Sequence, residues 1–372
     1  MSILFEEFNI KSMKLKNRFV RSATTDGCAE NTGHVADRQL SNIKNLAHGG
    51  AGLIITGIAY VHDSGQIISL QNSIAEDKYI PGLKNFASAA HMNGTKVAVQ
   101  LFHAGREGSL FLNPQKCLAL APSANGDDPK LKKRYREIKE EEIHEIIEAF
   151  GDAAKRAKEA GFDAVQVHGA HVYLLSQFLS PAVNKRKDKW GGSLENRLRL
   201  HCEICRSIRE KTGDDYPVMI KLGVKDGFEG GLEFAEGKEA AVILAESGYD
   251  ALEISLGIRG KGYENSEYKT GIKGVDKEGY FRDCCQEIKS LVNIPVMMVG
   301  GLRSFELMED IVLKKDADLI SLCRPLIKEP DIIKQWENNS SDRKRSTCIS
   351  CNKCLEALFR GNEVSCVQLK KK

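Results

Sequence analysis

Ala164-Val-Gln-Val167 leads directly into His168-Gly-Ala-His171-Val-Tyr173, so a short β-branched run ends in two imidazoles and a phenol. Residues 140–160, just before it, have the pattern of an amphipathic helix, and Gly161 is a residue type that commonly follows the last turn of a helix. The stretch therefore predicts a helix, a tight turn and a buried strand whose carboxyl end carries polar side chains. Such a unit is the building block of an alternating α/β fold.

The same alternation recurs along most of the chain. Eight strands are expected, at residues 18–21, 52–56, 97–101, 164–167, 218–222, 251–255, 296–299 and 318–322. Helices are expected between most of them, at residues 37–47, 82–92, 140–160, 195–211, 234–247, 281–291 and 305–313. Alternating units imply a parallel sheet with right-handed crossovers, and eight of them favour a closed (β/α)8 TIM barrel. An open doubly wound sheet is the alternative, but no Gly-x-Gly-x-x-Gly follows the first strand.

The composition is that of a globular protein and argues against two kinds of partner. Of 372 residues, 54 are basic and 51 acidic, so no basic field favours nucleic acid. No apolar run approaches the ~20 residues of a membrane span. The N-terminal residues 1–8 carry acids where a signal peptide would be basic. The eleven cysteines are unevenly spaced, so a reducing cytoplasm is the expected location.

The chain is expected to divide into a barrel at residues 1–336 and a cysteine-rich extension at residues 337–372. A polar segment, residues 337–345, follows Trp336 and opens the extension. Two stretches of the barrel, residues 105–139 and 257–280, are too long for tight turns. Loops of this length in a TIM barrel usually belong to the active face.

The polar residues after the fourth strand suit chemistry on a carbonyl compound. The imidazoles of His168 and His171 can donate hydrogen bonds to an oxygen, and the phenol of Tyr173 can deliver a proton. The alternative is that the histidines lie in the core and that the tyrosine packs as an aromatic ring. Together, the three residues predict a site that polarises a carbonyl and protonates the carbon beside it.

Other strand ends carry residues that suit a phosphorylated flavin. Gly300 and Gly301 follow the seventh strand and Cys323-Arg324-Pro325 follows the eighth, where barrels often bind phosphate. Polar side chains also stand inside two apolar strands, at Gln100 and Lys221. A glutamine offers both a donor and an acceptor to a flavin pyrimidine edge, and a lysine would stabilise the anionic reduced flavin.

These residues belong to motifs that resemble the Old Yellow Enzyme family of FMN-dependent oxidoreductases. The resemblance covers residues 1–335 and rests on several separate motifs: Lys16-Asn-Arg-Phe-Val20, Gly52-Leu-Ile-Ile-Thr-Gly57, Gln100-Leu-Phe-His103-Ala-Gly-Arg106, His168-Gly-Ala-His171-Val-Tyr173, Asp188-Lys-Trp-Gly-Gly-Ser-Leu-Glu-Asn-Arg197, Gly300-Gly301 and Cys323-Arg324-Pro325. It implies a TIM barrel that binds FMN and accepts electrons from NADH or NADPH.

The resemblance also implies a role for each matching residue. His168 and His171 correspond to the pair that binds the substrate carbonyl, and Tyr173 corresponds to the proton donor. The residues that correspond to the FMN site are Thr25, Gly57, Gln100, Lys221, Gly300, Gly301, Cys323 and Arg324. Lys221 stands where many members have arginine, so the positive charge is kept but the bidentate hydrogen bonding of a guanidinium is lost. Ala23 stands where many members have proline.

The implied activity is that of an FMN-dependent ene-reductase. Hydride would pass from NAD(P)H through FMN to the β-carbon of an α,β-unsaturated carbonyl, and Tyr173 would protonate the α-carbon. Two alternatives stay open at this point: an amine (C–N) dehydrogenase, and a non-catalytic flavin electron-transfer module. Related amine dehydrogenases attach FMN to a cysteine where this chain has Thr25, which argues against the first. A homo-oligomer is compatible with the sequence.

The extension contains Cys348, Cys351, Cys354 and Cys366, four thiols in nineteen residues. Such a set suits a [4Fe–4S] cluster, or alternatively a structural zinc ion. It resembles the branch that includes 2,4-dienoyl-CoA reductase and trimethylamine dehydrogenase, except that the second and third cysteines are one residue closer together. Since the sequence ends at Lys372, the flavin and nucleotide domains of that branch are expected to be absent. A separate donor protein, such as ferredoxin, could then supply electrons.

Overall fold

The computed structural model describes residues 2–110, 118–124 and 135–369. Eight parallel strands close into a barrel, because β13 pairs with β3 and β3 pairs in turn with β4. The strands are β3 (Phe19–Arg21), β4 (Leu53–Tyr60), β6 (Lys96–Phe102), β9 (Ala164–Gly169), β10 (Val218–Gly223), β11 (Ala251–Ser255), β12 (Val296–Met298) and β13 (Leu319–Leu322). The predicted TIM barrel is confirmed.

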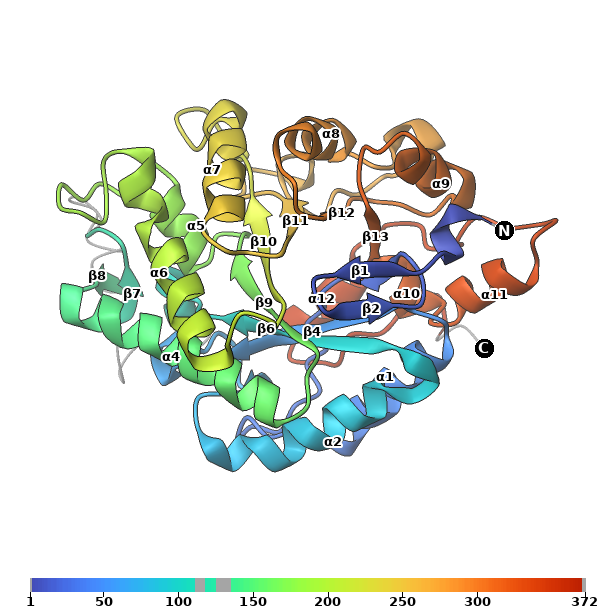
Figure 1. Ribbon diagram of the computed structural model, residues 1–372, viewed down its shortest axis with the longest axis horizontal. Helices are drawn as coiled ribbons and strands as arrows, with labels where there is room; N and C mark the ends of the chain where they lie inside the picture. The colour runs from blue at the N-terminus through green and yellow to red at the C-terminus, as the bar shows by residue number, and fades with distance from the viewer. Residues whose placement is uncertain (1, 111–117, 125–134, 370–372) are drawn as a thin grey trace.

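Helices surround the barrel, with α1 and α2 on one side and α7, α8 and α9 on the opposite side in Figure 1. The outer helices are α1 (Asp37–His48), α2 (Ile80–Ala90), α4 (Glu140–Glu159), α6 (Leu194–Thr212), α7 (Phe234–Glu246), α8 (Arg282–Leu291) and α9 (Phe305–Leu313). All seven predicted helices are present. The largest hydrophobic cluster lies between these helices and the strands, and includes Phe150, Leu198 and Ile288. Cys205 packs into it, and Cys202 lies beside it.

The amino end of the barrel is closed by a hairpin that the sequence pattern did not reveal. Strands β1 (Phe8–Ile10) and β2 (Met13–Leu15) pair antiparallel, and Lys11 adopts a φ of 50° in the turn. Ile10, Met13 and Leu15 pack against strand residues that face the barrel interior, such as Met219. Three-residue strands are too short to show a clear alternation of apolar and polar residues.

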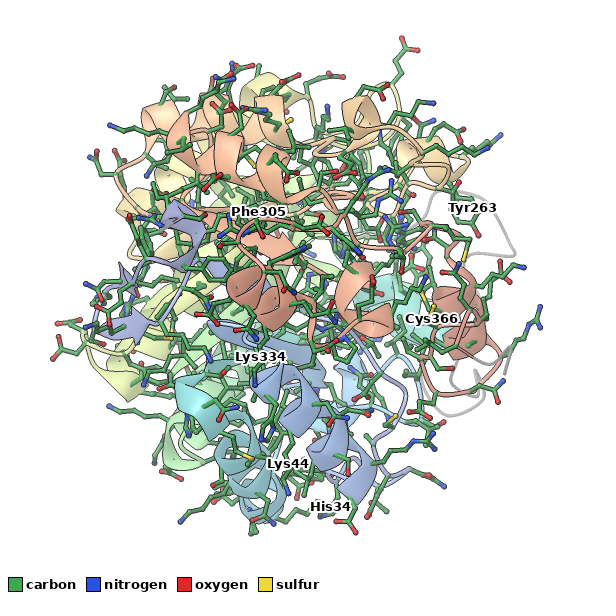
Figure 2. All side chains as sticks on the ribbon, turned by 90° about the vertical axis from the view of Figure 1, so that its right-hand side faces the viewer. His34, Lys44, Tyr263, Phe305, Lys334 and Cys366 are labelled. Atoms are coloured by element: carbon green, nitrogen blue, oxygen red, sulfur yellow. The ribbon has the colours of Figure 1, made fainter. Side chains whose placement is uncertain are left out.

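The remaining elements are short and connect the larger ones. They are β5 (Asn72–Ser73), β7 (Ala119–Ala121), β8 (Tyr135–Glu137), α5 (Leu174–Leu179), α10 (Arg324–Lys328), α11 (Ile332–Asn338), α12 (Lys353–Phe359), and the 3-10 turns Ile3–Phe5, Asp63–Gly65, Asp77–Tyr79, Met92–Gly94, Gly105–Leu110, Tyr263–Asn265 and Val275–Lys277. Figure 2 labels Lys334 of α11 and Lys44 of α1 on the face turned toward the viewer. The backbone of Lys334 donates to the carbonyl of Gly49, 2.9 Å away, at the end of α1.

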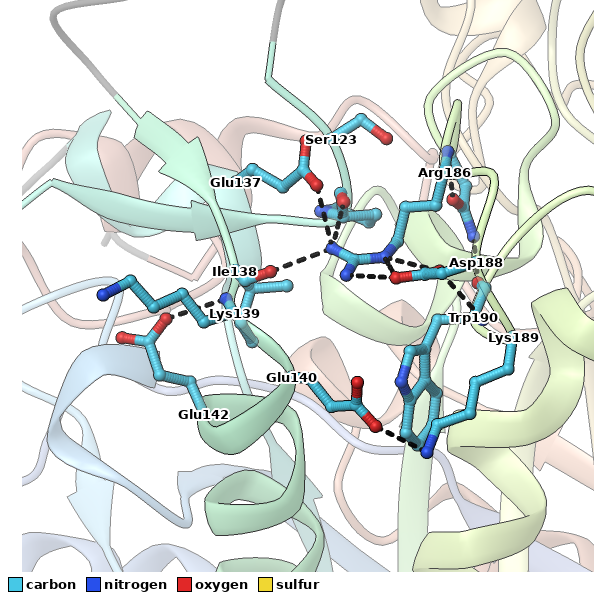
Figure 3. A network of polar contacts seen from close by, with 12 residues as sticks. Ser123, Glu137, Ile138, Lys139, Glu140, Glu142, Arg186, Asp188, Lys189 and Trp190 are labelled. Atoms are coloured by element: carbon cyan, nitrogen blue, oxygen red, sulfur yellow. Dashed lines mark hydrogen bonds and ion pairs between the residues drawn. The ribbon is translucent and has the colours of Figure 1, made fainter.

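The motif at residues 188–197 fastens the loop between α5 and α6 to the rest of the barrel (Figure 3). Arg186, just before it, donates to the carbonyls of Pro122 at 2.9 Å and Ile138 at 2.8 Å, and also pairs with Asp188 at 2.6 Å. Trp190 is buried, and Lys189 lies over its ring at 5.4 Å. This part of the resemblance therefore marks a structural anchor of the loop between α5 and α6.

The extension packs against loops at the carboxyl ends of the strands. The backbone of Ser346 donates to the carbonyl of Arg303 at 3.0 Å, and that of Val364 donates to the carbonyl of Asp26 at 2.9 Å. The predicted boundary after residue 336 stays a prediction. None of the helices in the described ranges combines the length and apolar character needed to cross a lipid bilayer.

Candidate active site

A cavity of about 460 Å³ opens at the carboxyl ends of the barrel strands. Ten of the predicted catalytic and cofactor residues line it: Thr25, Gln100, His168, His171, Tyr173, Lys221, Gly300, Gly301, Cys323 and Arg324. They come together because parallel strands end at one rim of a barrel. Register makes some of them direct neighbours, since Lys221 on β10 lies opposite His168 on β9.

Gly57 is the predicted cofactor residue that does not line the cavity. A Cβ placed on Gly57 would stand 2.9 Å from the carbonyl oxygen of Thr24 and 3.0 Å from the Cα of Thr25. Gly57 therefore lets β4 approach the loop after β3 closely. The register of β4 against β6 shifts between Ile55 and Ile58, and the strand continues to Tyr60. The structure gives Gly57 a packing role, and its contact with FMN stays a prediction.

One wall of the cavity carries the imidazoles and the phenol. The rings of His168 and His171 lie 5.0 Å apart, and that of Tyr173 lies 5.1 Å from His168. Phe102 supports Tyr173 from β6, with ring centroids 4.6 Å apart. The backbone of Ala170 donates to Nδ1 of His168 at 3.3 Å, so the neutral ring of His168 carries its proton on Nε2.

The turn between His171 and Tyr173 is held in an unusual conformation. His171 and Val172 have φ values of 59° and 68°, in the left-handed region that a β-branched residue rarely enters. Their backbone N–H groups donate to the carbonyls of Leu256 and Gly257, each at 3.1 Å. The Nε2 atom of His171 also lies 2.7 Å from the hydroxyl of Ser255. Hydrogen bonds to β11 and the loop after it thus hold the turn in a strained shape, as occurs at functional sites.

Burial sets the protonation of this wall. Desolvation, followed by the charges of Lys221 and Arg259, holds the pKa of His171 well below 6.5. Burial also lowers the pKa of His168, with His171 the next largest cause. Both rings are therefore neutral near pH 7 and each has one N–H to donate. Burial raises the pKa of Tyr173 to about 12, which keeps its proton in place.

Gln100 and Lys221 form the polar floor of the cavity, and buried polar side chains outside the lining connect them. Nε2 of Gln100 donates to Oε1 of Gln166 at 2.7 Å, and Nε2 of Gln166 donates to Glu253 at 2.9 Å. Lys221 lies 3.2 Å from Glu253 and donates to Ser22 at 2.9 Å. The sequence prediction included Gln100 and Lys221 but missed Gln166 and Glu253. The same signal, a polar residue inside an apolar strand, would have found both.

The opposite end of the cavity suits an anionic group. Gly301 has a φ of 72°, and a Cβ there would stand 3.0 Å from the ring of Tyr280, so this turn needs glycine. Arg324 donates to the carbonyl of Lys269 at 2.8 Å and to Asn352 at 2.7 Å. The hydroxyl of Ser321 lines the same cavity and is buried, with no hydrogen-bond partner among the residues that the structure describes. A buried, unpaired hydroxyl beside an arginine and a glycine turn fits a bound phosphate.

The loop after β11, predicted to lie at the active face, supplies further cavity residues. Arg259, Glu267 and Tyr268 all line the cavity. Arg259 pairs with Glu267 through contacts of 2.7 to 3.0 Å and lies 5.1 Å from the ring centroid of Tyr268. The sequence prediction placed this loop correctly but named none of its side chains. In the other long loop, residues 111–117 and 125–134 lie outside the described residues.

Three polar residues within or near the motifs, His103, Arg106 and Cys28, do not line the cavity. His103 is buried, and its ring bonds to Ser64 at 2.9 Å and to the backbone of Gly105 at 3.0 Å. Arg106 pairs with Glu107, 3.3 Å away. Cys28 does not line the cavity, and burial raises its pKa to about 12, so its thiol is poorly nucleophilic.

The four cysteines of the extension line one small pocket of about 20 Å³, next to Arg324 and Asn352. Cys354 also lines the main cavity. In the described part of the chain, no three His, Cys, Asp or Glu side chains are placed so that they could hold a metal ion. The donor set thus fits a metal-thiolate site in its chemistry, although the thiols are not gathered around one point.

A TIM barrel with an anion-binding end, a polar floor and proton-donating side chains defines a class of flavin-dependent oxidoreductases. The chain belongs to the NADH:flavin oxidoreductase / NADH oxidase family, whose sequence model matches residues 3–343. This confirms the resemblance stated from the motifs. FMN fits the cavity, because ten of the predicted residues and the unpaired hydroxyl of Ser321 converge there.

Relatives show the same affiliation. The chain is 37% identical over 352 residues to the NADH oxidase of Thermoanaerobacter brockii, covering 94% of this chain and 52% of that protein. It is 32% identical over 391 residues to the cinnamate reductase of Clostridium sporogenes, covering 98% of this chain and 57% of that protein. A structure of 2-naphthoyl-CoA reductase with 2-naphthoyl-CoA aligns with a TM-score of 0.87 at 30% identity, covering 98% and 56%. This chain spans about half the length of these relatives.

Proposed function

We propose that this protein is an FMN-dependent ene-reductase that reduces the C=C bond of an α,β-unsaturated carbonyl compound. The observation that carries the proposal is the wall formed by His168, His171 and Tyr173, which presents two neutral N–H donors and one protonated phenol to the cavity. A module that only carried electrons would need no proton donor. The names of the relatives agree, since one reduces cinnamate and another 2-naphthoyl-CoA.

FMN would lie across the cavity between the polar floor and the anion-binding end. Gln100 and Lys221 would face its pyrimidine edge, Thr25 its central ring, and Gly300, Gly301, Cys323 and Arg324 its phosphate. When bound, FMN supplies the carrier that takes hydride from NADH or NADPH and gives it to the substrate.

The residues of this chain would bind and protonate the substrate. Nε2–H of His168 and the ring N–H of His171 donate to the carbonyl oxygen, which draws electron density from the C=C bond. Tyr173 holds a proton on its phenol oxygen and gives it to the α-carbon. The β-carbon receives a hydride, so the net reaction converts NAD(P)H, a proton and the unsaturated carbonyl to NAD(P)⁺ and the saturated carbonyl.

We further propose that Cys348, Cys351, Cys354 and Cys366 hold a [4Fe–4S] cluster, with zinc as the alternative metal. The support is that all four thiols line one pocket and that the pocket shares Cys354 with the main cavity. Four cysteine thiolates are the usual ligands of such a cluster. Electrons could then also come from a donor protein such as ferredoxin, and the expected site of action is the cytoplasm.

Amine dehydrogenation is the less favoured activity. Thr25 occupies the position where the flavin-linking cysteine would stand, and Thr25 lines the cavity. The thiol of Cys28 lies outside the cavity, so it offers no substitute. The structure therefore presents no thiol at the position expected for covalent attachment of FMN.

The function is tested by anaerobic purification followed by half-reaction kinetics. The visible spectrum should show the two bands of FMN, and iron and acid-labile sulfide should be present. The reduced protein should then be reoxidised by an enone such as cyclohexenone or by cinnamaldehyde. Protein that binds no FMN, or reduced flavin that neither compound reoxidises, would refute the proposal.

A further inference from the structure

Glu253 is a fully buried carboxylate that lies outside the cavity lining and contacts two residues of that lining, Ser22 and Lys221. It lies on β11, and its register neighbour on β10 is Lys221. The side chain of Glu253 is 0% exposed and that of Lys221 is 4% exposed, and their charged atoms are 3.2 Å apart.

Each oxygen of Glu253 has a defined partner. Oε1 accepts from the hydroxyl of Ser22 at 2.7 Å, and Oε2 accepts from Gln166 at 2.9 Å as well as facing Lys221. Gln166 in turn accepts from Gln100 at 2.7 Å. Glu253 therefore joins the two residues expected to contact the flavin pyrimidine ring, Gln100 and Lys221.

We propose that Glu253 is a positioning residue that lowers the reduction potential of the bound flavin through Lys221. This inference rests on the proposed placement of FMN above Lys221. An isolated lysine cation would favour the reduced flavin, which carries more negative charge than the oxidised form. A lysine paired with a buried carboxylate presents almost no net charge, so it favours the reduced flavin much less.

Because solvent is excluded, the negative charge of Glu253 offsets the positive charge of Lys221 effectively. Water screens exposed ion pairs strongly, but a pair with both side chains almost fully buried interacts with its surroundings at a low effective dielectric constant. Glu253 also fixes the direction of the Lys221 ammonium and, through Gln166, that of the Gln100 amide. A low flavin potential suits the delivery of hydride to weakly activated C=C bonds.

The test is the midpoint potential of bound FMN at pH 7, measured by dye equilibration in the wild type, E253Q, K221M and the double variant. Glu253→Gln keeps the size and most hydrogen bonds but removes the charge. We expect E253Q to raise the two-electron potential by about 30 mV or more, equivalent to a tenfold preference for reduced flavin. The same substitution in the K221M background should change the potential much less, because the lysine charge is already gone.

Asp316→Asn is the matched control. The Asp316 side chain is 2% exposed and pairs with Arg282 at 2.6 Å, but unlike Lys221 this cation does not line the cavity. Its substitution should change the preference for reduced flavin less than about threefold. Glu253→Asp, which keeps the charge, should restore a potential close to that of the wild type.

An unchanged or lower potential in E253Q, or the same shift in both Lys221 backgrounds, overturns the inference. If E253Q alone does not fold, the double variant remains decisive because it removes both charges of the pair. Its potential should stay close to that of the wild type, and a clear fall below the wild type would overturn the inference. Wild-type protein that lacks FMN or cannot reduce an enone would instead refute the proposed function. FMN-loaded, active wild type with an unchanged E253Q potential refutes only the role of Glu253.

Discussion

Replacing Tyr173 with phenylalanine separates proton delivery from every other feature of the cavity. The substitution removes one hydroxyl and keeps the ring, which packs against Phe102 at 4.6 Å and against His168 at 5.1 Å. Because these ring contacts stay, the free energy of unfolding should change by no more than about 1 kcal/mol. The binding of FMN should be unaffected, since no proposed flavin contact is altered.

The expected loss is confined to the step that needs a proton. A positioned general acid contributes about 10²- to 10⁴-fold, or about 3–5 kcal/mol of barrier. Tyr173→Phe should therefore slow enone reduction by the reduced enzyme at least about 100-fold, while flavin reduction by NADH changes less than about twofold. In the wild type, the pKa of Tyr173 is raised to about 12, so enone reduction should persist at neutral and mildly alkaline pH and decline only as pH rises toward that value.

Anaerobic stopped-flow absorbance resolves the two half-reactions. Tyr60→Phe is the matched control, because Tyr60 is also buried and its pKa is also raised to about 12, but it does not line the cavity. It should behave as the wild type in both half-reactions. Enone reduction at the wild-type rate in Tyr173→Phe would remove Tyr173 from the role of proton donor.

Three further predictions concern stability and the extension. His201 is buried and its pKa is lowered to about 3, so below the unfolded pKa of about 6.5 only the unfolded chain binds the extra proton. Between pH 6 and pH 5 the free energy of unfolding of the wild type, measured with urea, should therefore fall by about 1 kcal/mol, whereas that of His201→Leu should not. Equal pH dependence in the two proteins would contradict this. Arg186→Met should lower the free energy of unfolding by about 3 kcal/mol, because two buried carbonyls lose a charged donor; a change within about 0.5 kcal/mol would show that the anchor is dispensable. Cys354→Ser should lose iron and labile sulfide yet retain FMN, whereas Cys202→Ser should retain the iron, the sulfide and the FMN. If Cys354→Ser retains its iron, the thiol of Cys354 is not a ligand.

Much of the architecture could be predicted from the sequence because barrel strands and helices are coded locally. The strands are buried on both faces, so they appear as short apolar runs, and the seven predicted helices all match outer helices of the structure. The hairpin of β1 and β2 and the short helix α5 escaped prediction, since elements of three to six residues show no clear period.

The candidate site divides in the same way. The types of residue at the strand ends indicated a carbonyl-binding and flavin-binding site, and ten of the predicted residues do line one cavity. Gly57 lies outside that cavity because its neighbours are backbone atoms of Thr24 and Thr25, a contact that no local pattern reveals.

By itself, the sequence determined the barrel, the residue proposed as proton donor and the cysteine set, because each depends on residue type and spacing along the chain. Only the tertiary structure showed that Lys221 forms an ion pair with Glu253, that Arg259 lines the cavity, and that Asn352 of the extension contacts Arg324. The physical reason is that electrostatics depends on distance and burial. Those quantities arise only when strands far apart in sequence become neighbours around a closed sheet.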